Sequence, residues 1–513
     1  MKFLFKTYLL VYILISVYLD VNAQAGSDVR ELDAYFSDAL NKWGVPGMAV
    51  AIIKDDSVIL MKGYGVRETG KNDLVDEHTL FAVASNSKSF TATAMGILVD
   101  EGKIKWDGKV ADYLPWFRLY DPYVTQNITI RDLLSHRTGL ETFSGDLIWY
   151  GSTYSRDEVI KRAALLKPKY GFRAVYGYSN IMYLAAGQII ASVSGMNWDE
   201  FIRMRILNPL EMIHTNTSIT QLDMEGNTAK PHNDDDDKVI SINYLNWDNI
   251  GPAGSINSSA SDMIKWIQFQ LKKGKWNDHE LISEKSLREL WTPQTIQRVS
   301  PIAEKLWPST HFKSYGMGWS LMDYHGKKVI SHSGGYDGMI SFTGFVPEAG
   351  LGFVILTNKN SSLYYPLSFK ILDSFLSGEK TDWSTRFLEL ENKNRETDRK
   401  EKEEQALKRI HGTSPTLPLD KYVGSYISEI YGEARIQMKN NQLYLNFIPT
   451  PLFHSPLAHW QYNTFTIKFP DVPSLPEGKA AFILDSDGGI DKMLIDVPNP
   501  DFDFTELEFI RQN

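Results

Sequence analysis

The sequence predicts a mixed α/β or α+β catalytic domain followed by a small all-β barrel. Residues 24–380 have short apolar runs typical of strands at both ends and helical patterns between them. From Leu419 to the C-terminus, apolar and polar residues alternate in short runs that are separated by turn residues. We therefore assign residues 24–380 to the first domain, 381–415 to a charged linker or helix, and 416–513 to the barrel.

The chain begins with a segment typical of a secretory signal. Lys2 and Lys6 precede an apolar stretch from Thr7 to Leu19, and Val21-Asn22-Ala23 offers the small residues that a signal peptidase reads. The apolar stretch is shorter than the roughly 20 residues that a spanning helix needs, which favours cleavage over a retained membrane anchor. We expect residues 1–23 to be removed, and the mature protein to be periplasmic or secreted by a bacterium, with no stable membrane span.

Composition excludes several classes of protein. Of the 513 residues, 43% are hydrophobic and 23% are charged, as in soluble globular proteins. The net charge of −9, without a dense basic stripe, argues against a nucleic-acid partner. The absence of cysteine excludes a thiol nucleophile, a disulfide framework and a Cys-ligated zinc. The eleven histidines form no metal-binding motif, so we predict no metal and no cofactor.

The first domain is expected to combine a sheet with buried helices. Helical spacing covers residues 29–43, and two apolar runs around Lys54-Asp55-Asp56 predict a hairpin of buried strands. The run from Ser87 to Asp100 is apolar enough for a buried helix. Further helices are predicted over 131–134, 180–194 and 261–272, and strands over 48–53, 57–61, 328–330, 340–346 and 351–356.

The composition changes near residue 380. Residues 389–409 carry 14 charged side chains of mixed sign among 21, which predicts a solvated helix or linker. The segment His411 to Pro418 ends any helix. The barrel is then predicted from alternating strands over 422–426, 434–438, 442–446, 464–468 and 481–484.

A Ser-x-x-Lys pair gives the sharpest chemical signal. Ser85 and Lys88 precede an apolar run, and their spacing places both on one face at the start of a helix. A serine hydroxyl is a weak nucleophile unless a neighbouring base takes its proton. A lysine amine can do so when burial or nearby positive charge lowers its pKa. Taken alone, however, such a pair occurs by chance in many chains of this length.

Two further motifs lie downstream. Tyr178-Ser179-Asn180 precedes an apolar helical run; its tyrosine can relay a proton and its asparagine can hydrogen-bond a substrate. The alternative is a buried tyrosine followed by a helix-capping asparagine. His332-Ser333-Gly334-Gly335 follows a predicted strand, where small residues leave room for a substrate backbone. Here the alternative is a glycine-rich hairpin.

In this order and spacing, the three motifs resemble those of the serine β-lactamase and penicillin-binding protein superfamily. The Tyr-Ser-Asn and His-Ser-Gly versions are similar to the class C β-lactamase-like group, which includes peptidases and esterases as well as β-lactamases. The resemblance covers roughly residues 29–375 and implies an antiparallel sheet flanked by helices. Residues 416–513 resemble the lipocalin-like barrel that some members of this group carry.

The resemblance also implies a role for each motif residue. Ser85 would attack the substrate carbonyl and become acylated, while Lys88 and Tyr178 act as a coupled base and acid. Asn180 would orient Lys88 and the substrate amide. His332 stands where many relatives carry lysine, and Ser333 would contact Tyr178 or a substrate carboxylate. The backbone N–H groups of Ser85 and Gly335, the latter next to Gly334, would form the oxyanion hole.

The predicted function is that of an exported serine hydrolase that cleaves an amide or ester in a small molecule, short peptide or D-amino-acid derivative. Because His332 is only partly protonated near pH 7, strong recognition of a substrate carboxylate is disfavoured. A β-lactamase or D-alanyl-D-alanine carboxypeptidase remains an alternative. So does a non-hydrolytic penicillin-binding or sensing protein, or an acyltransferase. The barrel would cap the cleft, mediate oligomerisation, hold a substrate tail or merely pack; the sequence predicts neither the substrate nor the oligomeric state.

Overall fold

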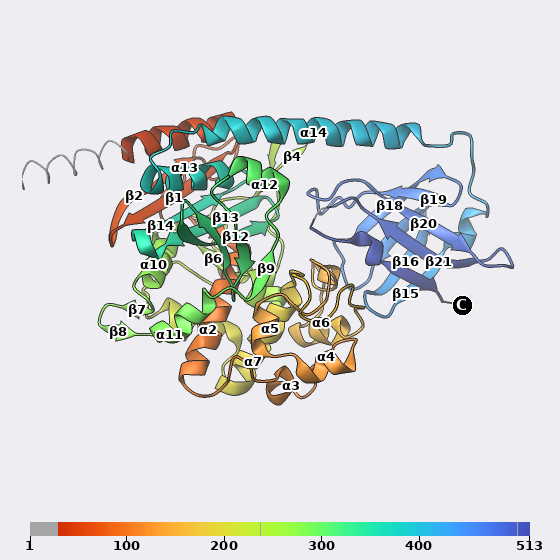
Figure 1. The fold of residues 1–513 in the computed structure, drawn as a ribbon. Helices are drawn as coiled ribbons and strands as arrows, with labels where there is room; N and C mark the ends of the chain where they lie inside the picture. The colour runs from red at the N-terminus through yellow and green to blue at the C-terminus, as the bar shows by residue number, and fades with distance from the viewer. Residues whose placement is uncertain (1–28, 236–237, 500, 513) are drawn as a thin grey trace, which may run out of the picture.

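We analysed a computed structural model, which describes residues 29–235, 238–499 and 501–512. The predicted signal segment, residues 1–23, lies outside the described residues. A sheet domain and a barrel stand beside each other, and one long helix, α14 (Trp383–Leu407), runs along the sheet domain toward the barrel (Figure 1). Among the described helices, none is long and apolar enough to cross a membrane.

The first domain is built on an antiparallel sheet of eight strands, as expected. Their order is β2-β1-β14-β13-β12-β11-β10-β9, so the first and last parts of the domain pair at β1 and β14. The strands are β1 (Gly47–Lys54), β2 (Ser57–Gly65), β9 (Thr295–Gln297), β10 (Lys313–Tyr315), β11 (Ser320–Tyr324), β12 (Lys327–Tyr336), β13 (Met339–Val346) and β14 (Leu351–Thr357).

Both faces of the sheet are covered, which explains why its central strands are continuous apolar runs. Successive side chains of a strand point to opposite faces. In β1, Met48, Val50 and Ile52 enter one hydrophobic core, whereas Ala49 and Ala51 enter the other. Polar alternation therefore disappears from such a strand, as it does in sheets buried on both sides.

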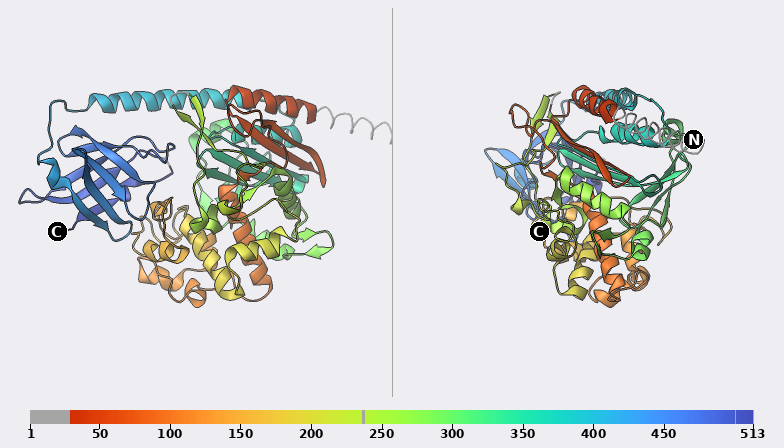
Figure 2. Two further views of the ribbon diagram at one scale, coloured as in Figure 1. Left: turned by 180° about the vertical axis from the view of Figure 1, so that it is seen from behind. Right: turned by 90° about the vertical axis from the view of Figure 1, so that its left-hand side faces the viewer.

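Different helices cover each face of the sheet (Figures 1 and 2). A helix over residues 29–42, α13 (Tyr364–Leu376) and the first turn of α14 form one core with the sheet. The other core contains α2 (Ser87–Asp100), α7 (Asn180–Ser194) and α10 (Ala260–Leu271). The remaining α-helices are α3 (Val110–Tyr113), α4 (Pro122–Asn127), α5 (Ile130–Leu134), α6 (Arg156–Ala163), α8 (Trp198–Ile202), α9 (Gly251–Gly254), α11 (Glu284–Leu290) and α12 (Pro301–Leu306).

The prediction of a hairpin of two buried strands is wrong for its second strand. Strand β2 is the edge of the sheet, pairs with β1 alone, and leaves Val58 and Met61 exposed. Ile59, Leu60 and Tyr64 contribute to one hydrophobic core, whereas Val58 and Met61 remain exposed. The strand predicted over 328–330 is also longer than expected, since β12 continues through the His332-Ser333-Gly334-Gly335 motif.

The charged segment near residue 390 forms a helix. In α14, only Trp383 and Ser384 are buried, and the rest of its 25 residues lie on the surface. Ion pairs one turn apart, such as Arg395 with Glu391 and Lys400 with Glu396, line its exposed side. Phe387 and Leu388 also pack against the sheet domain, and beyond them the helix is stabilised by local pairs rather than by an apolar face.

The C-terminal domain is a closed barrel of eight antiparallel strands. Aromatic side chains such as Tyr426, Phe447, Phe465, Phe482 and Phe509 are buried in it. Sequence alternation predicts five strands and misses β18, β21 and β22. The strands are β15 (Gly424–Ser428), β16 (Gly432–Lys439), β17 (Gln442–Phe447), β18 (His454–Gln461), β19 (Thr464–Ile467), β20 (Gly478–Leu484), β21 (Ile490–Asp496) and β22 (Glu508–Arg511).

The sheet core provides a stability test. Phe353 in β14 is fully buried, whereas Leu407 at the end of α14 is 85% exposed. We expect Phe353→Ala to lower the free energy of unfolding by about 3–5 kcal/mol, because it leaves a cavity between β14 and its covering helices. Leu407→Ala should change it by less than about 0.5 kcal/mol. Urea unfolding followed by circular dichroism measures both; equal effects would contradict the assigned packing.

Candidate active site

The candidate nucleophile lies in a tight turn between a strand and the central helix. Ser85 belongs to a short 3-10 helix, Ala84–Asn86, that leads directly into α2. Ala84 has a φ of 45°, a left-handed conformation that is unfavourable for a residue with a side chain. The Asn86 amide fixes this turn to β13, since it donates to Ser341 Oγ at 2.8 Å and accepts from Thr343 Oγ1 at 2.6 Å.

The Lys88 amine lies at the centre of the site and is fully buried. Its Nζ is 2.9 Å from Ser85 Oγ, 2.7 Å from Asn180 Oδ1 and 2.9 Å from the carbonyl oxygen of Ala253. Burial lowers the pKa of Lys88 well below its ordinary value, although the Asp146 carboxylate opposes this shift. Three helices therefore meet at one amine: α2, α7 and α9.

A buried carboxyl that the sequence analysis missed orients Asn180. Asp146 Oδ2 accepts from Asn180 Nδ2 at 2.6 Å, and its Oδ1 accepts from Trp149 Nε1 at 2.9 Å. Because its amide nitrogen is engaged there, Asn180 turns its oxygen toward Lys88. Burial raises the pKa of Asp146 to about 7. Asp146 belongs to no local motif, although it lies in the loop from Leu140 to Tyr154.

Tyr178 lies against the same amine. The Lys88 Nζ is 4.7 Å from the centre of its ring, and burial raises the pKa of the Tyr178 phenol well above its ordinary value. His136 packs against this ring at 4.3 Å between centroids, and its Nδ1 accepts the backbone N–H of Ser179 at 3.1 Å. The protonated Tyr178 is thus held in place through its own backbone segment.

His332 carries no charge near neutral pH, which corrects the expectation of partial protonation. Burial and the nearby Lys88 lower its pKa to about 3. Its Nδ1 is 2.6 Å from the Ser333 carbonyl oxygen, which can only accept, so that nitrogen carries the proton. Its Nε2 then accepts from Tyr315 OH at 2.9 Å. Ser333 and Tyr364 both line the cavity beside His332.

The two glycines that follow differ in their surroundings. A Cβ on Gly334 would lie 2.1 Å from the Val83 carbonyl oxygen and 3.0 Å from the Ser85 nitrogen, so only glycine lets β12 approach the nucleophile turn. A Cβ on Gly335 would meet nothing closer than Ile340 Cδ1, at 3.7 Å. Gly335 faces open space beside Ser85.

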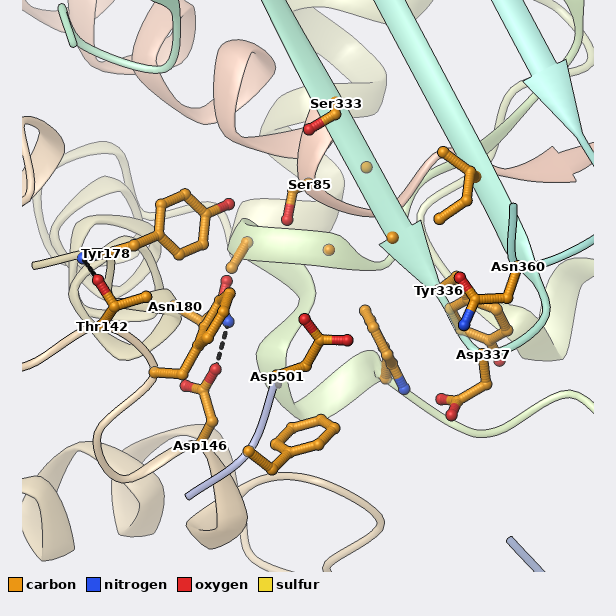
Figure 3. A pocket seen from close by; sticks show the side chains of 18 of the residues that line it. Ser85, Thr142, Asp146, Tyr178, Asn180, Ser333, Tyr336, Asp337, Asn360 and Asp501 are labelled. Carbon is orange, nitrogen blue, oxygen red and sulfur yellow. Dashed lines mark hydrogen bonds between the residues drawn. The ribbon is translucent and has the colours of Figure 1, made fainter. Parts of the chain in front are cut away.

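These residues border one cavity of about 550 Å³. Of the eight site residues predicted from sequence, seven line it: Ser85, Tyr178, Asn180, His332, Ser333, Gly334 and Gly335. Lys88 does not border the cavity itself; its Nζ contacts Ser85 Oγ, and Ser85 borders the cavity. Figure 3 shows this arrangement from close by, with Asp337 and Asp501 on the opposite side of the cavity. Sequence reasoning missed both of these acids, and Asp501 comes from the barrel.

The barrel also fixes the loop that carries Asp146. Glu506 Oε1 accepts from Ser144 Oγ at 2.6 Å, and its Oε2 accepts from the backbone N–H of Gly145 at 2.9 Å. Tyr431 OH donates to the same carboxylate at 2.6 Å. The carboxylate stands at the start of the short 3-10 helix Asp146–Ile148, where it satisfies a free N–H. A residue of the second domain thus contacts the segment that orients Asn180.

Among the described residues, one cluster of side chains could offer ligands to a metal ion. His325, Asp373 and Glu379 lie within reach of one another, outside the cavity. Both oxygens of Asp373 already accept hydrogen bonds, from Tyr324 OH at 2.5 Å and from Trp383 Nε1 at 2.6 Å. This group therefore serves the packing of α13 and α14, and nothing in it favours a metal ion.

Comparison with family models decides the family. Residues 32–366, more than half of the chain, match the model described as Beta-lactamase. The chain belongs to the β-lactamase family. It is therefore a member of the serine β-lactamase and penicillin-binding protein superfamily, as its three motifs predicted. Residues 408–511 match a domain of unknown function, DUF3471, and this match coincides with the barrel.

Curated relatives within the family include hydrolases. An unguisins hydrolase of Aspergillus campestris is 28% identical over 77% of this chain and 75% of its own length. Protein flp of Staphylococcus aureus strain COL is 28% identical over 68% of this chain and 67% of its own length. The octameric penicillin-binding protein homologue from Pyrococcus abyssi shares the fold, with a TM-score of 0.59 and 20% identity over 94% of this chain and all of that one. Family and relatives support a serine hydrolase.

The paired glycines of β12 provide a test of this site. We expect Gly334→Ala to lower the free energy of unfolding by at least about 2 kcal/mol, because the new methyl group meets backbone atoms that cannot move aside. Gly335→Ala should change it by less than about 0.5 kcal/mol, since its methyl group has room. Chemical denaturation of the two variants gives the comparison. Equal stability of both would show that β12 does not approach the Ser85 turn as described.

Proposed function

We propose that this protein hydrolyses an amide or ester bond in a small molecule or short peptide through an acyl-enzyme on Ser85. One observation carries the proposal: the buried Lys88 amine is bound by two acceptors and by the candidate nucleophile. D-amino-acid derivatives are among the substrates that fit this chemistry. The relatives named unguisins hydrolases support hydrolysis as the reaction.

The contacts of Lys88 determine which way the serine proton moves. The oxygens of Asn180 and Ala253 can only accept, so they take two N–H groups of the amine. A neutral amine has two N–H groups and one lone pair. The lone pair is then left for Ser85, whose Oγ lies 2.9 Å away, so the neutral amine can accept the serine O–H. Lys88 in its neutral form is thus oriented as the general base.

Tyr178 supplies the complementary acid. Its raised pKa keeps the phenol protonated beside Lys88 and Ser85. When Ser85 attacks, its proton passes to Lys88, and Tyr178 gives a proton to the leaving amine or alcohol and regains one from Lys88. Water then cleaves the acyl-enzyme by the reverse transfers. The backbone N–H groups of Ser85 and Gly335 stabilise the oxyanion, a contribution typically worth about 10²–10³ in turnover.

The charge of the pocket disfavours the β-lactamase and carboxypeptidase alternatives. Those substrates carry a carboxylate, which a cationic third-motif residue would bind. His332 is neutral, and the cavity-lining residues include neither lysine nor arginine. Non-hydrolytic sensing and acyl transfer use the same acyl-enzyme and differ only in its fate.

We propose that the mature protein is exported and acts in the periplasm or outside the cell. Lys2, Lys6 and the apolar stretch that follows them support this location. The acidic net charge, without a dense basic stripe, supports a small-molecule or peptide substrate rather than a nucleic acid. The chemistry proposed for Ser85 requires no cofactor or metal.

The nucleophile can be tested by intact-mass spectrometry. Mature protein treated with p-nitrophenyl acetate should gain one acetyl group, and Ser85→Ala should gain none. Ser87→Ala is the matched control, because Ser87 is buried in the same turn but its Oγ accepts from the backbone N–H of Ile256. An adduct on Ser85→Ala would contradict the proposal. Rapid loss of the wild-type adduct indicates hydrolysis, whereas its persistence favours the sensing alternative.

The pH profile tests the base. Because burial lowers the Lys88 pKa, the active neutral amine should form well below the ordinary lysine pKa of about 10.4. We expect kcat/KM to rise with pH and to reach its plateau below the pH at which an ordinary lysine would lose its proton. Lys88→Met should lower kcat/KM by about 10²-fold or more. A rise centred near pH 10 would show that Lys88 is an ordinary charged lysine.

A further inference from the structure

The barrel forms part of the wall of the active-site cavity. Residues Ser474, Leu475, Asn499, Asp501 and Phe502, all from loops of the barrel, line the same space as Ser85. Hydrogen bonds between the domains hold these loops near the catalytic residues. Ser474 Oγ donates to Asp337 Oδ1 at 2.8 Å, next to the His332-Ser333-Gly334-Gly335 motif. The shape and charge of the cavity therefore depend on the second domain.

Asp501 is the charged group that the barrel brings to the cavity. Figure 3 shows its carboxylate directed into the cavity, toward the side on which Ser85 lies. Its backbone N–H donates to Asn499 Oδ1 at 2.8 Å, which fixes the turn, whereas its carboxylate has no partner among the described residues. The cavity walls remove enough water to raise the pKa of Asp501, although the side chain still meets solvent.

Asp337 adds a second acidic group on the same side. Its Oδ1 accepts from Tyr150 OH at 2.7 Å and from Ser474 Oγ. Its Oδ2 is shielded from solvent and has no hydrogen-bond partner among the described residues. Because one oxygen is shielded and the other is already bound, Asp337 adds acidic character to this side of the cavity rather than a free acceptor.

Aromatic faces stand beside the two carboxylates. Trp247, Tyr336 and Phe502 line the cavity, and the rings of Trp247 and Tyr336 lie 4.7 Å apart. Carboxylates and aromatic faces together are the groups with which proteins bind organic cations. The lining residues include no lysine or arginine that could neutralise these carboxylates. The nearby Lys88 Nζ is already bound to Ser85, Asn180 and Ala253.

We propose that Asp501, with Asp337 beside it, binds a protonated amine of the substrate, so that the barrel selects substrates with an ammonium group near the scissile bond. This inference rests on the proposed hydrolase function of Ser85 and names its substrate class. An anionic substrate is disfavoured by the same groups. The barrel then contributes to substrate specificity, because the catalytic domain alone lacks Asp501.

Matched substrates test this selectivity in the full-length mature protein. Both enantiomers of alanine p-nitroanilide carry an ammonium group, and their N-acetyl counterparts do not. We expect the better of the free enantiomers to exceed its N-acetyl counterpart in kcat/KM by about tenfold or more, the size of a charge-assisted hydrogen bond. Asp501→Asn should abolish this preference by lowering kcat/KM for the free enantiomer about tenfold or more. Asp491→Asn removes the same charge from an exposed barrel position and should retain the preference.

The outcomes separate the inference from the function on which it rests. Hydrolysis of p-nitrophenyl acetate that depends on Ser85 reports the function and requires no ammonium group. If this hydrolysis is present, the inference is overturned by equal kcat/KM for free and N-acetyl anilides, by turnover of neither, or by an equal loss of both in Asp501→Asn. If it is absent, or unchanged in Ser85→Ala, the proposed function itself fails.

Discussion

The structure depends on the burial of one amine. Lys88 Nζ has no access to water, so its hydrogen-bonding groups must find partners in the protein. The partners come from three separate segments: the nucleophile turn, the start of α7 at Asn180, and the carbonyl of Ala253 in α9. These segments must pack so that each reaches the Lys88 amine. The contacts that satisfy the amine within the helical layer therefore also set the geometry of the candidate active site.

A second set of contacts carries this constraint outward to the barrel. The amine orients the Asn180 oxygen, Asp146 holds the Asn180 nitrogen, and Glu506 holds the loop on which Asp146 lies. Each link is a hydrogen bond between groups that are distant in sequence. The two domains therefore share one polar network, and their buried apolar side chains also belong to one hydrophobic core. The network around the candidate active site extends past the boundary that the family matches draw between residues 366 and 408.

Sequence predicted the parts of this protein whose signals are local. The apolar run after Asn180 gives the full extent of α7, and the spacing of Ser85 and Lys88 places both on one face of a helix. Asp146 and Asp501 carry no such signal, because their roles arise only when loops from distant segments meet. The local sequence also could not predict the charge state of His332, because the pKa of its ring depends on how completely the fold excludes water.

The long helix α14 has a consequence for how the domains stay together. Phe387 and Leu388 pack against the sheet domain, and beyond them the helix is largely exposed, so most of its length serves as a tether. Docking of the barrel combines polar contacts with apolar ones: the Tyr150 ring lies 5.9 Å from that of Phe453 and 4.3 Å from that of Phe502, and one hydrophobic core includes residues of both domains. A tether of this kind raises the local concentration of one partner around the other to about the millimolar range. Covalent linkage and the interface therefore act together to keep the cavity complete, and a severed barrel would lose the contribution of the tether while keeping the contacts that dock it.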